Sequence, residues 1–581
     1  MTDYFSTNAI QAFLLSLAPG LPLVTACAFL VPSIRSLAYR LFPWAALPAL
    51  LVALFGSTTV AIEIPWFFMG GRIGLDDLGK TFLLFTSFLW LVSGLFGREY
   101  LADDTKRFRF QIFYLLAMSG NFGLILAQDM LSFYLFFTLM SFAAYVLIIH
   151  DGSDKARRAG RIYLWLVVVG EVILFTGMII LAQTSSSMAF SKIDKDLSGI
   201  ILLALLFLGF GIKAGALPLH FWLPVAHPAA PSPASAVLSG TMIKAGLLGW
   251  LRFLPVGSTN LTEGGIFFLI AGLLAAFYGI TAGFFRNNPK TVLAYSSISQ
   301  MGLMTVIVGS GMILPQIWPK AVTAASLYAF HHCLAKGSLF LATGVAKNGW
   351  NRGIPAWLFR AGLILPSLAL AGMPFTSGAI AKSALKSITT NLPEPWHEVC
   401  SILLPLAAVG TMALLVHFLR LTWQPSRQDN RHGQGLRRAW MFNLAGVAVT
   451  LWLWPGSETA ARHSLTPGTV IHGLWTVAAG CLLAFALTRL IRQRPTAQES
   501  HPGVDSFPQK IFKKLFLHCF PDRSARGQHG DLSKYKVDGR NTRFQVIEVQ
   551  LGKIEKIFGR WTISGLFFLM ISILIILSLR S

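Results

Sequence analysis

Residues 204–246 read ALLFLGFGIKAGALPLHFWLPVAHPAAPSPASAVLSGTMIKAG, two apolar segments joined by a proline-rich connection. Each segment carries a lysine, Lys213 or Lys244, where hydrocarbon is expected. Placing an ammonium group at the centre of a bilayer costs at least about 2.5–3.5 kcal/mol, so such a lysine is a candidate functional residue. Gly215 and Pro218 weaken the helix around Lys213, and irregular backbone at membrane depth is tolerated only where protein or a water-filled cavity covers it. Interrupted helices with ionisable groups near the midplane are typical of transporters.

The composition of the 581-residue chain indicates a polytopic membrane protein. It is 54% hydrophobic and 13% charged, whereas a soluble domain has about 25% charged residues. The net charge of +23 does not indicate nucleic-acid binding, because the basic residues lie in short loops between apolar spans. That distribution is typical of positive-inside topology and of attraction to anionic lipid. The five cysteines contain no CxxC pair, so we expect no metal site and no cofactor in this chain.

We predict an all-α membrane protein with about 14–16 transmembrane helices, since about 20 apolar residues span a bilayer. The candidate spans lie near residues 9–32, 41–62, 80–97, 110–128, 130–149, 160–183, 198–218, 235–255, 264–285, 292–313, 321–346, 358–388, 398–422, 438–454, 468–491 and 561–579. If the N-terminus faces outward, most loop Lys and Arg residues face inward. The positive-inside rule therefore predicts that both termini are periplasmic, in the inner membrane of a bacterial cell.

The block IKAGALPLHFWLPVAHPAAPSPASAVLSGTMIKAG at residues 212–246 resembles the antiporter-like membrane subunits of respiratory complex I, the Mrp antiporters and membrane-bound hydrogenases. Its AHPAAPSPASA portion is most similar to the large antiporter-like subunit of formate hydrogenlyase and related group-4 hydrogenases. The resemblance extends well over roughly residues 75–425 and more weakly to the C-terminal helix. It implies a core of two inverted five-helix repeats that act as half-channels.

The interrupted seventh span has a counterpart in the twelfth, LALAGMPFTSGAIAKSALK at residues 368–386, and paired interruptions favour an inverted-repeat transporter. The basic segment at 492–560 is expected either to bind lipid headgroups or, as the resemblance implies, to lie along the membrane against neighbouring subunits. The predicted parts are 1–109 (helices 1–3), 110–255 (first repeat, helices 4–8), 256–425 (second repeat, helices 9–13), 426–491 (helices 14 and 15), 492–560 (basic amphipathic segment) and 561–581 (final transmembrane helix).

Further ionisable residues lie inside apolar spans. His332 and Lys336 are four residues apart and share one helix face, matching a His-to-Lys pattern of the family, with His331 beside them. Lys382 matches the ionisable residue at the family's exit side. A path across about 30 Å requires groups that exchange protons. We therefore predict a proton pathway made of Lys213, Lys244, His332, Lys336, Lys382, Glu171, His331, His220 and His227.

The chain departs from the family at one position. The resemblance implies a glutamate in the span at 130–149 that pairs with Lys213, but this position is Thr138 and the span contains no acid. Glu171, deep in the next span, is the available substitute, and we predict that it pairs directly with Lys213. Two alternatives stay open: the first repeat has lost coupled pumping, or Glu171 is a hydrogen-bonded residue between helices.

These features predict a proton-translocating antiporter-like subunit of a complex-I-like or hydrogenase-type respiratory complex. We expect the redox chemistry in other membrane and peripheral subunits, so this chain would be a non-catalytic transport subunit of an oxidoreductase or translocase. A proton is favoured over Na⁺, which prefers carboxylate and carbonyl oxygens. The alternatives are the membrane subunit of a gradient-driven inorganic carbon (CO₂ or bicarbonate) uptake complex with a zinc-dependent partner, a cation/proton antiporter subunit, and a non-pumping scaffold.

Overall fold

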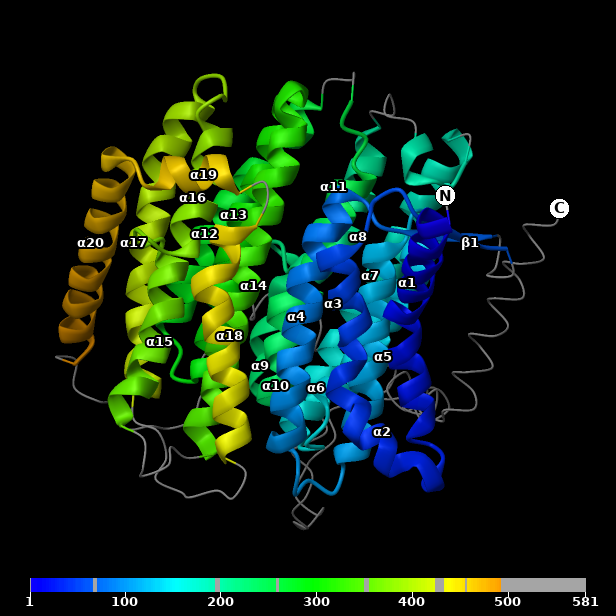
Figure 1. Ribbon diagram of the computed structural model, residues 1–581. Helices are drawn as coiled ribbons and strands as arrows, with labels where there is room; N and C mark the ends of the chain where they lie inside the picture. Colours follow the sequence, from blue (N-terminus) through cyan, green and yellow to red (C-terminus); the bar gives the residue numbers. More distant parts are fainter. Residues whose placement is uncertain are drawn as a thin grey trace, which may run out of the picture. The chain divides into compact units, whose positions relative to one another are not determined.

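A computed structural model describes residues 2–492, with gaps at 66–69, 186, 194–198, 258–260, 349–354, 424–432 and 455–456. Twelve of its helices are long and apolar enough to cross a membrane, and Figure 1 shows them packed side by side. The predicted polytopic all-α fold is therefore confirmed. The predicted span at 561–579 and residues 493–560 of the basic segment lie outside the described residues.

The N-terminal part contains a short hairpin that the sequence did not predict. Its elements are α1 (Thr2–Ala28), α2 (Arg35–Leu41), α3 (Leu47–Phe55), β1 (Ala61–Ile64), β2 (Gly71–Gly74) and α4 (Asp77–Tyr100). The predicted helix at 41–62 was wrong at both ends, because α3 stops at Gly56, whose backbone is extended. Exposed and half-buried side chains alternate along residues 61–64, as in a strand, and Ala61 pairs with Gly74 in an antiparallel register.

The next helices carry the sequence block that contains Lys213 and Lys244. They are α5 (Arg107–Leu126), α6 (Met130–Ile148), α7 (Asp154–Thr184), α8 (Ile200–Ala214), α9 (Trp222–Ala229), α10 (Ser232–Val237) and α11 (Lys244–Phe253). Side-chain caps fix two of the starts: Asp129 accepts from the Ser132 amide before α6, and Ser153 accepts from the Ala156 amide before α7.

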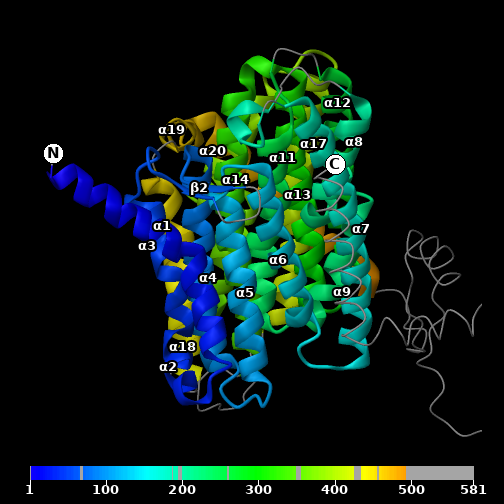
Figure 2. The same ribbon diagram turned by 90° about the vertical axis from the view of Figure 1, so that its right-hand side faces the viewer.

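The remaining helices are arranged around one of them, α14, which packs against α13, α16, α18 and also α4. They are α12 (Thr262–Phe284), α13 (Pro289–Ile313), α14 (Trp318–Asn348), α15 (Ala356–Ala371), α16 (Ser377–Thr389), α17 (Trp396–Thr422), α18 (Gly433–Leu453), α19 (Glu458–Ser464) and α20 (Pro467–Arg492). Short 3₁₀ or π turns lie at Pro32–Ile34, Phe42–Ala46, Phe190–Lys192, Leu219–Phe221, Leu238–Met242 and Pro315–Ile317. Although α4 and α18 are far apart in the sequence, they lie side by side (Figures 1 and 2).

Both helices that the sequence predicts to be interrupted are interrupted. The helix α8 ends at Ala214 because Gly215 takes a left-handed conformation with φ 70°. The helix α15 ends at Ala371 in the same way, with Gly372 at φ 85°. Glycine reaches this region without the steric cost that a Cβ brings, which is why it terminates helices. The relation of the two five-helix units by inverted symmetry stays a prediction.

Candidate functional site: a row of buried ionisable residues

The ammonium of Lys213 is held between three helices. Lys213 occupies the last turn of α8 and is 2% exposed. Its Nζ donates to Ser141 Oγ on α6 at 3.1 Å and to Tyr163 Oη on α7 at 3.0 Å. Tyr163 in turn donates to the Ser141 carbonyl at 2.9 Å. The Phe137 ring, 5.8 Å from Nζ, adds a cation–π contact. The charge is therefore surrounded by hydroxyl groups and aromatic faces.

The carboxylate of Glu171 lies beside the position where the family resemblance implies a glutamate. Its Oε2 accepts a hydrogen bond of 2.7 Å from Thr138 Oγ1, and the side chain is buried between α6 and α7. Thr138 and Ser141 are three residues apart on one face of α6. The chain therefore brings a carboxylate to this place from α7. The family resemblance implies a carboxylate carried by α6 instead.

Glu171 and Lys213 interact electrostatically, but the described structure has no direct ion pair between them, so their direct pairing stays a prediction. Within the described ranges, none of the ion pairs joins these two residues. Each instead binds a hydroxyl of α6, Glu171 through Thr138 and Lys213 through Ser141. The physical reason is geometric: the two side chains approach α6 one turn apart and each meets a hydroxyl there. Glu171 Oε1 is buried with no hydrogen-bond partner in the described part of the chain.

A second cluster joins α11 to α14. Lys244 Nζ lies 2.5 Å from His332 Nδ1 and donates to the Ser239 carbonyl at 2.6 Å. Ser239 belongs to the π turn that separates α10 from α11, and such turns occur often at functional sites. Both side chains are fully buried. A lysine and an imidazole at this distance can hold a shared proton on either partner.

Three more predicted residues continue the row along α14, α15 and α16. Lys336, one turn after His332, donates to the Leu293 carbonyl of α13 at 2.9 Å. His331 Nδ1 lies 2.9 Å from Ser377 Oγ at the start of α16. Lys382 donates to the Ala371 carbonyl, which the end of α15 leaves without a helical partner.

Gly372 makes room for this contact. A Cβ at that residue would stand 2.5 Å from Lys382 Cδ, so a larger residue would displace the lysine. The ammonium therefore stabilises the negative end of the interrupted helix.

The two histidines near the break in α8 are buried and poorly satisfied. His227, on α9, stacks on Phe340 with 4.6 Å between ring centroids, and neither ring nitrogen has a partner among the described residues. His220 packs against Tyr278, and its Nδ1 also lacks one there. Buried polar atoms of this kind usually bond to protein or ordered water, so both rings are candidates to contact water.

Sequence reasoning missed several residues of the site. Ser141 and Tyr163 bind Lys213, but nothing distinguishes them in sequence from other polar residues of apolar spans. Lys290 was also missed. Its Nζ donates to the Ala230 carbonyl at 2.7 Å, close to His227 and at the end of α9. Its place in the NNPKT stretch at the start of α13 was the available signal.

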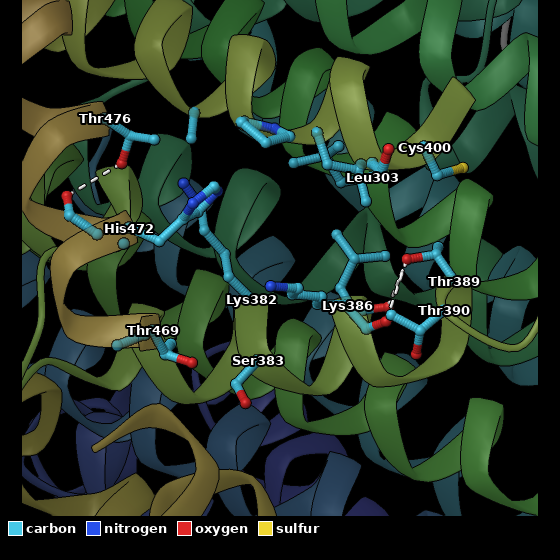
Figure 3. Close-up of a pocket in the computed structure, with 18 of the residues that line it drawn as sticks. Leu303, Lys382, Ser383, Lys386, Thr389, Thr390, Cys400, Thr469, His472 and Thr476 are labelled. Atoms are coloured by element: carbon cyan, nitrogen blue, oxygen red, sulfur yellow. Dashed lines mark hydrogen bonds between the residues drawn. The ribbon is translucent and has the colours of Figure 1, made fainter. Parts of the chain in front are cut away.

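The predicted row is divided in two. One group contains Glu171 and Lys213 with the hydroxyls of α6 and α7, and the other contains Lys244, His332, Lys336, His331 and Lys382. Within the described chain, no hydrogen bond links the Lys213 group to the Lys244–His332 pair. Proton transfer between the groups would therefore need water or a rearrangement. Lys382 opens onto a cavity of about 220 Å³ lined by α16, α17 and α20 (Figure 3).

This arrangement defines a class: polytopic membrane proteins with interrupted helices and buried lysines near the breaks. Residues 127–403 match the family described as NADH:quinone oxidoreductase/Mrp antiporter, TM. The chain is 30% identical over 450 residues to hydrogenase-4 component B of Escherichia coli (strain K12), covering 74% of this chain and 64% of the relative. The predicted resemblance is confirmed, since residues 127–403 match this family and the curated relatives are subunits of the same kind.

Solved structures show the same fold. A chain of the Mrp complex from Dietzia sp. DQ12-45-1b has a TM-score of 0.71 at 19% identity, covering 94% of this chain and 62% of that one. A chain of respiratory complex I from Thermus thermophilus has a TM-score of 0.65 at 22% identity, covering 78% of this chain and 99% of that one. The chain covers less than two thirds of the length of the curated relatives that it matches.

Proposed function

We propose that this chain is a proton-translocating subunit of a multisubunit membrane complex. The observation that carries the proposal is the arrangement around Thr138, where a buried carboxylate and a buried ammonium bind neighbouring hydroxyls of α6. Glu171 and Lys213 thus form an acid–base unit, although α6 lacks the glutamate that the family resemblance implies at position 138. Buried ionisable residues in a membrane are costly and usually mark ion or proton paths.

The hydroxyl groups provide the connection between the two charges. A serine, threonine or tyrosine hydroxyl can donate one hydrogen bond and accept others, so it can pass a proton along a chain. Thr138, Ser141 and Tyr163 occupy the space around Glu171 and Lys213. Adding a proton to Glu171 removes the counter-charge of Lys213, which then favours release of the lysine proton. Lys244 and His332 would accept it through water.

The rest of the predicted pathway follows in order. Lys336 lies one turn beyond His332 on α14, and Lys382, on α16, donates to the carbonyl at the end of α15. His331 bridges these two elements through Ser377. His220 and His227 would line the water access at the break in α8. In this proposal, residues 110–255 and 256–425 act as two half-channels of opposite orientation.

The partners of this chain are part of the proposal. The relatives include hydrogenase-4 component B, and structural neighbours come from the Mrp complex and respiratory complex I. We infer that this chain likewise assembles with other membrane and peripheral subunits, in the inner membrane of a bacterium with both termini outside. Electron transfer would then occur in a partner subunit.

The test exchanges the carboxylate between helices. Glu171→Gln is expected to lower proton transport at least about tenfold, which corresponds to roughly 1.4 kcal/mol on the barrier, because Lys213 loses its counter-charge. The double variant Thr138→Glu with Glu171→Gln is expected to recover a substantial part of the rate, since it returns a carboxylate to the same place from α6. The complex is purified from native membranes, its subunits are identified by mass spectrometry, and proton uptake into vesicles is followed with a pH-sensitive dye under an imposed potassium potential.

Glu263→Gln is the matched control, because Glu263 is an exposed carboxylate at the start of α12. It is expected to transport at the wild-type rate. Wild-type transport in Glu171→Gln would contradict the proposed role of this residue and would favour a scaffold.

A further inference from the structure

The cavity beside Lys382 collects basic residues from three helices. Its volume is about 220 Å³, and α16, α17 and α20 each contribute one helical face. Lys382 and Lys386 are one turn apart on α16, and His472 faces them from α20 (Figure 3). His397 lines the same space from the start of α17. A cavity of this size holds an ion with several water molecules, since about 10–15 Å³ by the same measure accommodates one water.

No carboxylate lines this cavity within the described residues. Glu394 lies outside the lining and pairs with His397 at 3.1 Å, an exposed contact. Lys382 is hydrogen-bonded to a backbone carbonyl, and the ammonium of Lys386 has no hydrogen-bond or ion-pair partner in the part of the chain that is described. A partly buried ammonium such as that of Lys382 is unfavourable without a counter-charge, whereas Lys386 is exposed. The positive charge in the cavity is therefore uncompensated by protein.

The donors of the cavity also point to an anion. Lys386 has all three N–H groups available, and Lys382 has two beyond its bond to Ala371. His472 Nδ1 accepts from Trp475 Nε1 at 3.1 Å, so its proton lies on Nε2, which remains a donor. Thr469 accepts a hydrogen bond from Thr466 and keeps its own hydroxyl proton available.

We propose that this cavity binds a small monovalent inorganic anion of the chloride or bicarbonate class, held by Lys386, His472 and Lys382. Leu303, Leu404 and Pro405 make the remainder of the wall apolar. An ion that enters must give up part of its hydration shell, and this cost grows steeply with charge. A monovalent anion is therefore favoured over sulfate or phosphate.

The anion would be the counter-ion that the protein does not supply to Lys382. Its presence would favour the protonated lysine, and its departure would favour loss of the proton. Binding itself does not depend on the proposed function, because the cavity and its charges exist whether or not this chain moves protons. The proposal goes beyond that function by giving this end of the molecule a second ligand.

The test measures binding directly, without transport. Chloride-35 NMR line widths are recorded with the purified full-length protein in detergent. Wild-type protein is expected to broaden the chloride line in proportion to its concentration, and bromide or bicarbonate is expected to reverse the broadening, whereas sulfate at equal ionic strength does not. Lys386→Gln and His472→Gln are each expected to reduce the excess width at least threefold.

Lys320→Gln is the matched control, because Lys320 is an exposed lysine at the start of α14 that does not line the cavity. Its excess width is expected to equal that of wild type. Lys386 is exposed and no hydrogen bond depends on its side chain, so its replacement should leave folding intact, which thermal unfolding of each variant verifies. Equal broadening in wild type and in the double variant Lys386→Gln with His472→Gln would overturn the proposal. Displacement by sulfate as effective as by bromide would overturn the monovalent assignment.

Discussion

His150 and Asp104 form a titratable pair just beyond the ends of α6 and α4. His150 Nε2 lies 3.0 Å from Asp104 Oδ2. Burial lowers the pKa of His150, and the hydrogen bond from Asp104 offsets this only in part. Burial acts to raise the pKa of Asp104, but the Lys106 amide and the His150 ring outweigh it, so that pKa lies below its ordinary value. Both groups therefore bind fewer protons in the folded protein than in the unfolded chain.

The sign of the resulting pH dependence follows from linkage. Where the unfolded state binds more protons, stability falls as the pH falls. For His150 the loss begins as the pH drops below its unfolded pKa, near 6.5. We expect the unfolding temperature in detergent to fall between pH 7.5 and pH 5.5, and to fall less in His150→Gln. His397→Gln, a change at an exposed histidine, serves as the control. An identical pH profile for wild type and His150→Gln would rule out this contribution.

At the residue scale, the exchange between α6 and α7 has a simple physical basis. A carboxylate is required near the Lys213 site, but the residue that carries it can belong to either neighbouring helix, α6 or α7. Thr138 leaves space on α6, and Glu171 reaches it from α7. Which helix carries the acid is therefore a matter of side-chain reach.

At the element scale, α12 and α13 pack through glycines spaced by seven residues. Gly265 and Gly272 on α12 face Gly309 and Gly302 on α13, each against a backbone carbonyl of the partner helix. Small residues of this kind let two helices approach closely in a membrane, where van der Waals packing replaces hydrophobic association. This closely packed pair lies beside the buried row, since α13 also accepts the hydrogen bond of Lys336.

We expect Gly272→Ala to destabilise the protein by about 1–3 kcal/mol, the usual cost of overpacking. A Cβ there would lie 2.5 Å from the Gly302 carbonyl oxygen. Gly20→Ala is the matched control, since a Cβ at Gly20 inside α1 meets nothing within 4 Å. It is expected to be neutral or stabilising, as alanine favours helices. The measurement is the unfolding temperature in detergent, and equal values for the two variants would contradict close packing at Gly272.

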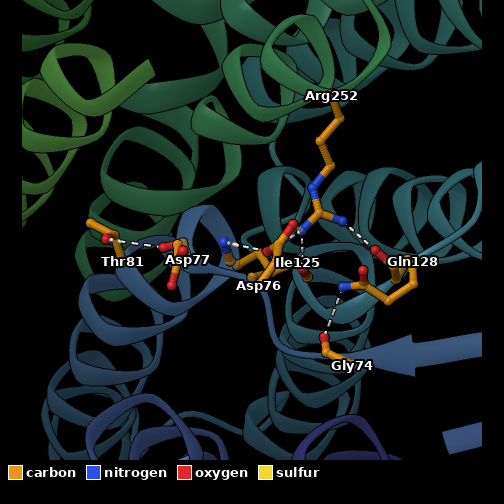
Figure 4. A network of polar contacts seen from close by, with 9 residues as sticks. Gly74, Asp76, Asp77, Thr81, Ile125, Gln128 and Arg252 are labelled. Atoms are coloured by element: carbon orange, nitrogen blue, oxygen red, sulfur yellow. Dashed lines mark hydrogen bonds and ion pairs between the residues drawn. The ribbon is translucent and has the colours of Figure 1, made fainter. Parts of the chain in front are cut away.

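At the scale of the whole molecule, Arg252 connects elements that are distant in sequence (Figure 4). Its guanidinium, 3% exposed, lies 2.9 Å from Asp76 Oδ1 at the start of α4. It also donates to the carbonyls of Ile125 and Ala127 at the end of α5. The planar, multiply donating guanidinium suits such a site better than an ammonium does. One side chain thus fixes the ends of α4, α5 and α11 together.

We expect Arg252→Met to lower the unfolding free energy by about 1–3 kcal/mol, below the 3–5 kcal/mol typical of a fully buried pair, because Asp76 is 42% exposed. Arg252→Lys is expected to lie between wild type and Arg252→Met, since it keeps the charge and loses the forked geometry. Unfolding temperatures in detergent provide the comparison. Wild-type stability in Arg252→Met would show that this connection does not hold the helices.

The sequence alone determined the membrane class, the approximate positions of fifteen helices and the two interruptions. These features are local: a run of apolar residues long enough to span a bilayer forms a helix whatever its neighbours, and Gly215 and Gly372 reach the left-handed region because they lack a Cβ. The buried lysines were predicted from the same local pattern, since each lies inside an apolar run. The end of α3 was mispredicted, because the helix stops before Gly56 and residues 61–64 form a strand.

Only the tertiary structure decided which ionisable residues meet. Lys244 and His332 are 88 positions apart and come together because α14 packs against the π turn that precedes α11. Glu171 binds Thr138 and Lys213 binds Ser141, an arrangement set by the separation and rotation of three helices. Hydrogen bonds depend on distances within a few tenths of an ångström. Helical periodicity gives the face on which a residue lies. It gives neither the partner helix nor the position of that helix along the axis, and these decide the contacts.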